Sequence, residues 1–209
     1  MAPQSDDRRT HWQTVYRTKR ADSVSWYRPH LEVSLQLLEG AGMSVSSRVI
    51  DVGGGASSLV DDLLARGLRN VSVLDVSDEA LLLTQHRLGE RANLVTWYAG
   101  DVLELALPPA HFDFWHDRAV LHFLTDPEDA SRYARIAANA VKIGGYAVIA
   151  GFAPGGPARC SGLNVAQRSA NDIAEIFSPA FALVREHIEL HHTPSASEQP
   201  FSYTLLQRR

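Results

Sequence analysis

Three consecutive glycines separate a short hydrophobic run from an amphipathic one in RVIDVGGGASSLVDDLLARG, residues 48–67. The first run is rich in Val and Ile, which predicts a buried strand, and the second has the roughly 3.6-residue period of a helix. Another buried run, NVSVLDVS at 70–77, follows closely. This order predicts a strand, helix, strand unit, which is the building block of parallel sheets.

The same alternation continues along the chain and ends in a different pattern. Helical and strand-like runs follow in the order helix 78–90, strand 92–101, strand 111–117, helix 126–145 and strand 146–152. A helix at 171–181 then precedes two strand-like runs, 182–190 and 201–208, joined by a connection too short for a helix. The chain is therefore predicted to be an α/β protein with a mostly parallel sheet, helices on both faces and a C-terminal antiparallel hairpin.

Composition narrows the classes of protein that fit this pattern. A chain of 209 residues, 45% hydrophobic and 21% charged, is predicted to form one domain, 1–209, with a helical N-terminal segment (1–42) and a core (43–209). The net charge of -4 and the lack of a basic run argue against nucleic acid as a partner. Cys160 is the only cysteine, and we see neither a signal peptide nor a membrane span, so we expect a cytoplasmic protein.

Acidic residues end three successive predicted strands: Asp51, Asp75 and Asp101. The carboxyl ends of parallel strands share one edge of the sheet, where open α/β sheets bind ligands. Asp75 is placed to accept hydrogen bonds from both hydroxyls of a ribose, and Asp101 to reach an adenine amino group. The glycines lack a Cβ and allow backbone to approach a ligand closely. A nucleoside is the ligand that this pattern predicts.

This order of motifs, from Arg48 onward, resembles the class I S-adenosylmethionine-dependent methyltransferases. The resemblance implies a Rossmann-like, seven-stranded sheet and S-adenosylmethionine as the cofactor. Ser57 departs from the fuller glycine pattern of that family. The core residues expected to contact the cofactor are Asp51, Gly53, Gly55, Asp75, Val76, Asp101, Val102 and His116.

Two further segments resemble particular members of that family. Asp117 and Arg118 resemble the DRGA segment of thiopurine-type S-methyltransferases and also the DKGT segment of a group of protein-lysine methyltransferases. WQTVY and SWY resemble the aromatic N-terminal segment of the thiopurine type, which implies that Trp12, Tyr16 and Trp26 belong to a lid over the cofactor. By the same resemblance, Asp117 contacts the cofactor's amino end and Arg118 faces the acceptor.

The resemblance favours a small-molecule acceptor, a thiol or another soft nucleophile, with a protein lysine as the alternative. Asp117, Arg118 and His122 are the catalytic candidates, because histidine is a general base near neutral pH and arginine binds anions. Each assignment has a structural alternative. Trp12, Tyr16 and Trp26 could be core aromatics, Asp117 and Arg118 could form an ion pair, and His122 could be a structural histidine.

The sequence also gives predictions for the late loop, for metal binding and for other functions. The glycine- and proline-rich loop after the strand at 146–152 is expected at the same sheet edge, with Cys160 either lining the acceptor pocket or incidental. We predict no metal, because close-spaced ligand pairs are lacking apart from His191 and His192, whose side chains would diverge. A non-catalytic adenosyl-binding module and an NAD-dependent dehydrogenase remain rival functions, although the dehydrogenase has no use for Asp101.

Overall fold

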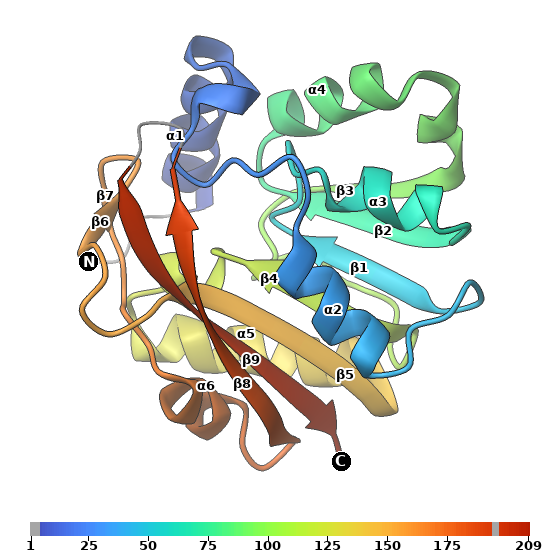
Figure 1. Cartoon of the computed structure of the whole chain (residues 1–209), viewed down its shortest axis with the longest axis vertical. Helices are drawn as coiled ribbons and strands as arrows, with labels where there is room; N and C mark the ends of the chain where they lie inside the picture. The colour runs from blue at the N-terminus through green and yellow to red at the C-terminus, as the bar shows by residue number, and fades with distance from the viewer. Residues whose placement is uncertain (1–4, 194–196) are drawn as a thin grey trace.

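The computed structural model describes residues 5–193 and 197–209, and its main sheet has the strand order β3-β2-β1-β4-β5-β9-β8 (Figure 1). Strands β3, β2, β1, β4 and β5 run parallel, whereas β9 is antiparallel to both of its neighbours, β5 and β8. The bounds of these strands are β1 Arg48–Val52, β2 Asn70–Asp75, β3 Val95–Ala99, β4 Phe112–Arg118, β5 Val141–Phe152, β8 Phe181–His192 and β9 Glu198–Arg208. The predicted seven-stranded α/β fold with its reversed hairpin is confirmed.

Helices cover both faces of the sheet. One face packs against α2, α3 and α4, and the other packs against α5 and α6, so the core has two hydrophobic layers. The helix bounds are α1 Ser5–Thr18, α2 Glu32–Gly40, α3 Leu59–Ala65, α4 Asp78–Leu88, α5 Pro127–Ala140 and α6 Ala170–Phe177, with short 3-10 turns η1 Ala21–Ser23, η2 Gly89–Leu94 and η3 Leu121–Phe123. Helix α1 lies above one end of the sheet rather than in either layer (Figure 1).

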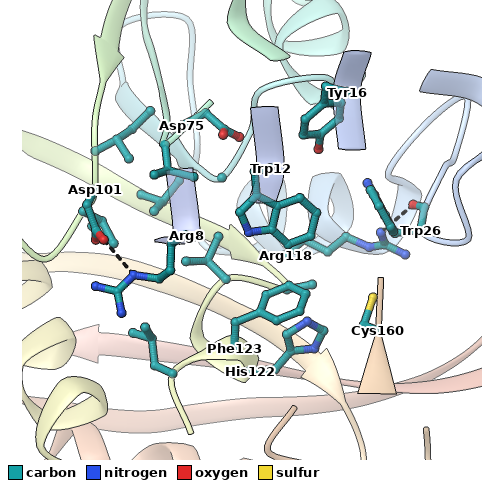
Figure 2. A pocket seen from close by; sticks show the side chains of 18 of the residues that line it. Arg8, Trp12, Tyr16, Trp26, Asp75, Asp101, Arg118, His122, Phe123 and Cys160 are labelled. Carbon is teal, nitrogen blue, oxygen red and sulfur yellow. Dashed lines mark hydrogen bonds and ion pairs between the residues drawn. The ribbon is translucent and has the colours of Figure 1, made fainter. Parts of the chain in front are cut away.

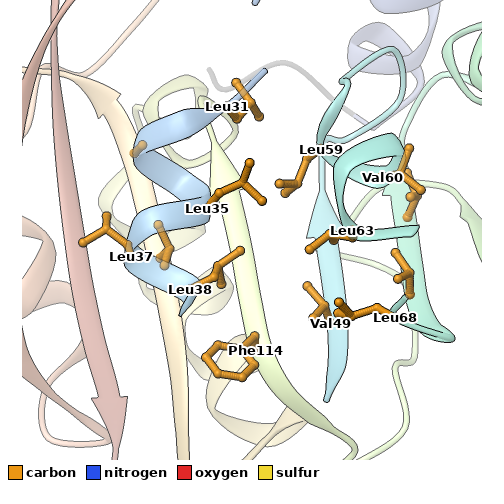
Figure 3. Close-up of a cluster of buried hydrophobic side chains, with 14 of the residues drawn as sticks. Leu31, Leu35, Leu37, Leu38, Val49, Leu59, Val60, Leu63, Leu68 and Phe114 are labelled. Carbon is orange, nitrogen blue, oxygen red and sulfur yellow. The ribbon is translucent and has the colours of Figure 1, made fainter. Parts of the chain in front are cut away.

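Leucines on α2 and α3 form the centre of the first layer (Figure 3). Leu38, Leu59 and Leu63 are completely buried, and they pack with Val49 of β1 and Phe114 of β4 in the same cluster. Burial of one such side chain stabilises the fold by about 1.5–3 kcal/mol. This layer fixes β1 and β4 side by side, and the carboxyl ends of these two strands form part of the site.

The structure differs from the predicted elements mainly at their ends. Asp126 accepts a hydrogen bond from the Glu128 backbone N–H at 2.8 Å, with Pro127 in the first turn, which confirms the predicted start of α5. The helix ends at Ala140 instead of continuing to residue 145, because Val141 already pairs with Phe112 as the first residue of β5. The long loop after β5 contains a small hairpin, β6 Arg159–Cys160 and β7 Leu163–Asn164.

Candidate functional site

A cavity of about 900 Å³, counting its open mouth, lies at the carboxyl ends of β1 to β4 (Figure 2). Helix α1 contributes Arg8, Trp12 and Tyr16 to its lining, β6 contributes Cys160 and β9 contributes Phe201. The predicted site residues that line this cavity are Trp12, Tyr16, Trp26, Gly53, Asp75, Val76, Asp101, Val102, Arg118 and His122. A smaller adjoining cavity is lined by Asp51 and His116 and shares Tyr16, Trp26, Gly53 and Arg118 with the first. Gly55 and Asp117 line neither cavity.

The three glycines leave room for the protein's own acids. A Cβ on Gly54 would lie 2.3 Å from Asp51 Oδ2, and one on Gly55 would lie 2.5 Å from Asp75 Oδ2. Gly53 has a left-handed φ of +69°, and a Cβ there would lie 2.1 Å from a methyl carbon of Val120. Only Gly53 lies on a cavity wall. The turn therefore serves mainly to hold carboxylates close to the backbone, which differs from the direct ligand approach expected from the sequence.

Asp75 is held by backbone amides at the end of β2. Its Oδ1 accepts from the Ser77 N–H at 2.8 Å and its Oδ2 from the Gly55 N–H at 3.0 Å. Burial raises the pKa of Asp75 to about 6, although both amide bonds favour the ionised form. Each ionised carboxylate oxygen accepts more than one hydrogen bond, so Asp75 keeps acceptor capacity toward the cavity that it lines.

Asp101 marks the place where α1 meets the sheet edge. Its Oδ1 accepts from the Leu103 N–H at 2.9 Å, and its Oδ2 accepts from Arg8 Nε at 2.8 Å (Figure 2). Arg8 also lies 3.6 Å from Asp129. An adenine amino group near Asp101 would therefore share this carboxylate with an arginine that the sequence did not single out.

Asp51 belongs to a buried chain of three polar side chains. Its Oδ1 lies 2.7 Å from His116 Nδ1, and His116 Nε2 lies 2.8 Å from the Ser34 hydroxyl on α2. All three residues are almost completely buried. Asp51 Oδ2 has no hydrogen-bond partner among the described residues. This orphaned acceptor beside the smaller cavity calls for a donor from a ligand, because unpaired buried acceptors are costly.

Asp117 does not reach the cavities, contrary to its predicted contact with the cofactor. It is fully buried, and it accepts hydrogen bonds from the Val120 N–H at 2.7 Å, the Leu121 N–H at 3.0 Å and the Tyr133 hydroxyl at 2.6 Å. Burial raises the pKa of Asp117 to about 6. Side chains alternate along a strand, so Asp117 faces α5 while His116 and Arg118 face the cavities. Its contacts tie the end of β4 to η3.

Arg118 is fixed by two hydrogen bonds and keeps one nitrogen free. Its Nε donates to the Tyr203 hydroxyl at 3.0 Å. Its Nη1 donates to the Trp26 carbonyl at 2.9 Å (Figure 2). The Tyr203 hydroxyl in turn donates to Glu189, which also pairs with Arg28. Arg118 Nη2 is buried and lacks a partner within the described residues. The guanidinium is thus oriented, with a donor left for a ligand.

His122 on η3 is only 3% exposed, and neither of its ring nitrogens has a partner in the described part of the chain. Burial, with smaller contributions from Arg168 and Arg118, lowers the pKa of His122 to about 3. The imidazole is therefore neutral at physiological pH. A neutral imidazole carries one donor and one acceptor, and both are available here.

Aromatic side chains connect these two polar residues in a closed ring of contacts, which we call the aromatic chamber. The ring centroid of Trp12 lies 5.8 Å from that of Trp26 and 5.1 Å from that of Phe123. The His122 ring lies 4.2 Å from the Phe123 ring and 5.0 Å from the Phe152 ring. The Phe152 and Phe201 rings lie 5.0 Å apart. The Arg118 guanidinium lies 4.5 Å from the centre of the Phe201 ring and closes the circle. The members are Trp12, Trp26, Arg118, His122, Phe123, Phe152 and Phe201.

Ion pairs hold α1 over the cavity. Arg9 pairs with Asp78, and Arg17 Nε donates to Glu79 at 2.7 Å. Two arginines of α1 therefore bind acidic residues in the first turn of α4. Gln13 donates to Asp78 at 3.0 Å. These contacts place Trp12 and Tyr16 against the cavity, which Trp26 also lines from the segment between η1 and α2.

Sequence reasoning missed Arg8, Ser34, Phe123, Phe152 and Phe201, because no local motif marks them. Cys160 of β6 does line the cavity, and burial raises its pKa to about 11, so it is a thiol at neutral pH. Within residues 5–193 and 197–209, no cluster of three or more His, Cys, Asp or Glu side chains is arranged to hold a metal ion. In the same residues, every helix is too short or too polar to cross a bilayer.

Comparison with known proteins gives one family match and many structural matches. Residues 50–149 match a methyltransferase domain model. The 1,6-didemethyltoxoflavin-N1-methyltransferase of Burkholderia thailandensis, solved with 1,6-didemethyltoxoflavin and S-adenosylhomocysteine, is 22% identical, with 96% of this chain and 87% of that chain covered and a TM-score of 0.72. The N-methyltransferase NodS of Bradyrhizobium japonicum, solved with S-adenosylhomocysteine, is 17% identical, with coverages of 85% and 84% and a TM-score of 0.67.

An S-adenosylmethionine-dependent methyltransferase of Anabaena variabilis covers 100% of this chain and 99% of its own, at 15% identity and a TM-score of 0.74. No curated protein sequence matches the chain significantly. At these identities the structural matches establish the fold.

Proposed function

We propose, from the premise that this chain is a class I S-adenosylmethionine-dependent methyltransferase, that its acceptor is a small molecule with a soft nucleophile such as a thiol. One observation carries the proposal: a single cavity contains both the acids at the ends of β2 and β3 and the aromatic chamber. Cofactor and acceptor would therefore meet in one enclosed space.

The residues present fit the cofactor. The remaining acceptor capacity of Asp75 suits the two ribose hydroxyls, Asp101 lies at the adenine side, and the orphaned Asp51 Oδ2 suits an ammonium group. S-adenosylmethionine, when bound, supplies an electrophilic methyl group on a sulfonium. The chain then needs only to align the acceptor and exclude water.

A small acceptor is favoured over a protein side chain by the way the cavity is covered. Ion pairs fix α1 across its opening, and aromatic rings line the interior. The fixed positive charge of Arg118 opposes a lysine ammonium. The Burkholderia thailandensis enzyme, which has a similar fold, was solved with 1,6-didemethyltoxoflavin bound.

The first test follows the methyl group. The protein is incubated with methyl-labelled S-adenosylmethionine and a cell lysate, and protein is then separated from small molecules. We expect label in the small-molecule fraction, and loss of that label with Asp75→Asn. Label confined to protein would overturn the small-acceptor proposal in favour of protein-lysine methylation.

The second test identifies the acceptor class. Thiols, phenols, ring nitrogen compounds and amines are screened by release of S-adenosylhomocysteine. We expect turnover with soft nucleophiles. Calorimetry with S-adenosylmethionine, S-adenosylhomocysteine and NAD runs beside the screen, and cofactor binding without turnover of any acceptor or lysate component would favour a non-catalytic binding module.

A further inference from the structure

We propose that the acceptor is a planar aromatic or heteroaromatic acid that binds and reacts as its anion, with Arg118 as its counter-charge and His122 as a second hydrogen-bonding partner. The proposal rests on the small-molecule methyltransferase function above and specifies the substrate class of the same cavity. The aromatic chamber, the free nitrogen of Arg118 and the two free nitrogens of His122 carry it.

The walls of the chamber select a flat ring. Trp12 meets Trp26 and Phe123 edge to face, and Phe152 meets Phe201 in the same way. All five side chains also line the cavity, so ring faces and edges are available to a ligand inside it. Aromatic ligands gain from offset and edge-to-face contacts with such walls.

The charges around the chamber are positive in balance. Two carboxylates lie nearby. Glu189 is shared by Arg28 and, through the Tyr203 hydroxyl, by Arg118, and Asp117 accepts hydrogen bonds from the Val120 and Leu121 amides and the Tyr133 hydroxyl on the α5 side of β4. Arg168 donates to the carbonyls of Leu121 and Leu124 on the other side of His122. An anion would therefore enter a site with excess positive charge.

The other titratable groups near the chamber do not supply a negative charge. The charges of Lys19 and Arg118 act on Cys160, which stays a thiol at neutral pH. His191 Nε2 donates to the Ser25 carbonyl, 2.7 Å away, and burial lowers the pKa of His191. His11 of α1 also has a lowered pKa through burial. At the ends of β2 and β3, Asp101 is paired with Arg8, and Asp75 is bonded to backbone amides.

His122 is a hydrogen-bonding group and a poor proton acceptor. It lies buried between Phe123 and Phe152, and its protonated form would face two arginines, Arg118 and Arg168. The acceptor's proton must therefore leave for solvent when the acid binds. A neutral imidazole N–H then donates to the anion alongside Arg118 Nη2.

The transfer step balances without a base in the protein. A lone pair of the acceptor anion forms the new bond to the methyl carbon, the carbon–sulfur bond breaks, and its electron pair stays on sulfur as the thioether of S-adenosylhomocysteine. The negative charge of the acceptor and the positive charge of the sulfonium disappear together. The methylated product is neutral and loses its attraction to Arg118, which favours its release.

The binding experiment uses para-nitrophenol as the probe, because only its anion absorbs visible light. The protein is saturated with S-adenosylhomocysteine, the probe is added, and its spectrum is followed across pH. We expect the bound probe to ionise about 1–3 pH units below the free probe, the usual effect of one close opposite charge. Equal ionisation of bound and free probe would overturn the proposal, as would equal affinity for the neutral analogue para-nitroaniline.

Variants assign the shift to its residue. Arg118→Gln should abolish the shift, Arg118→Lys should restore part of it, and Arg66→Gln, which alters a surface pair with Glu39, should leave it unchanged. Affinity for S-adenosylhomocysteine, measured by calorimetry, verifies that each variant is folded. A full shift in a folded Arg118→Gln protein would contradict the assignment.

The kinetic experiment compares two para-substituted thiophenols of different acidity. We expect the midpoint of the kcat/KM pH profile to move with the acidity of the acceptor, and His122→Gln to raise KM without moving that midpoint. One common midpoint for both acceptors, lost in His122→Gln, would show that His122 is a base and overturn the proposal. Failure of the protein to bind S-adenosylmethionine would instead overturn the proposed function itself.

Discussion

The two halves of the cavity are built in different ways. The proposed cofactor half comes mainly from one continuous stretch, residues 48–103, in which Asp75 and Asp101 accept hydrogen bonds from amides two residues further along, with support from Arg8, Ser34 and His116. The proposed acceptor half is the aromatic chamber, whose members lie between positions 12 and 201 and meet only in the folded protein. The first half is therefore encoded locally and the second by tertiary packing, so acceptor preference can change while the cofactor site is retained.

The strongest challenge to this division is Asp75→Asn. Hydrogen bonds to a charged acceptor contribute about 1.5–3 kcal/mol each, so if Asp75 binds two ribose hydroxyls as proposed, loss of its charge should weaken S-adenosylmethionine binding by about 100-fold. Calorimetry measures the change, with Asp61→Asn, which pairs with Arg87 on the surface, as the control. Unchanged affinity in a folded Asp75→Asn protein would remove Asp75 from the cofactor half.

The second prediction concerns stability and pH in the acceptor half. The pKa of His122 is lowered to about 3 in the fold, so only the unfolded chain takes up this proton as pH falls below about 6.5. Wild type should therefore lose about 2 kcal/mol between pH 7 and pH 5 through this residue, a loss that His122→Gln should avoid. Urea unfolding of both proteins at the two pH values gives the difference, and parallel losses would contradict it.

The contribution of Asp75 to folding stability should change with pH in the opposite direction to that of His122. This difference would distinguish the two halves of the cavity. Its folded pKa is raised to about 6, above the unfolded value of about 3.9, so its stabilising contribution is present at low pH. That contribution is lost as pH rises through about 6. In the same urea series, Asp75→Asn should therefore gain stability over wild type as pH rises from about 4 to 7.

A smaller effect is expected from Ser34→Ala. Ser34 is the end member of the hydrogen-bonded series Ser34, His116 and Asp51. The serine hydroxyl bonds His116, which orients the Asp51 carboxylate. Loss of one hydrogen bond is worth about 1 kcal/mol, so S-adenosylmethionine should bind about fivefold more weakly, with the acceptor KM unchanged. Ser46→Ala, on the exposed surface, is the control. A change in acceptor KM alone would place Ser34 with the wrong half.

The smallest expected effect is that of the double variant Arg9→Gln, Arg17→Gln, which removes the pairs between α1 and α4. Exposed ion pairs contribute about 0.2–1 kcal/mol each. Two pairs at the lower end of this range sum to about 0.4 kcal/mol, so cofactor affinity should fall about twofold at low salt, and the difference from wild type should shrink as salt is added. A difference that is independent of salt would show that these arginines act by other means.

The reach of sequence reasoning follows the same division. The alternation of strands and helices, the C-terminal hairpin and the acids at the strand ends depend on local pattern, and they were predictable, whereas the order of the strands in the sheet was not predicted. Phe152 and Phe201 look like ordinary core residues in sequence and become neighbours only because β9 enters the sheet beside β5.

Asp117 is an instructive intermediate case. Its placement at the end of β4 was predictable, but the resemblance assigned it a cofactor contact that strand alternation opposes. Trp115 and Asp117 point to the layer of α5, where Tyr133 bonds both side chains. The period of two in FDFWHDR contained that information.

Strand β9 carries a consequence for biosynthesis. It lies between β5 and β8 in the sheet, and it supplies both the Phe201 ring beneath Arg118 and the Tyr203 hydroxyl that orients it. A ribosome makes this strand after the other six strands of the sheet and after the helices that pack on them. A nascent chain thus completes the proposed acceptor site only after β9 has emerged, and a polypeptide cut before β9 would lack that site even if the earlier strands had begun to assemble.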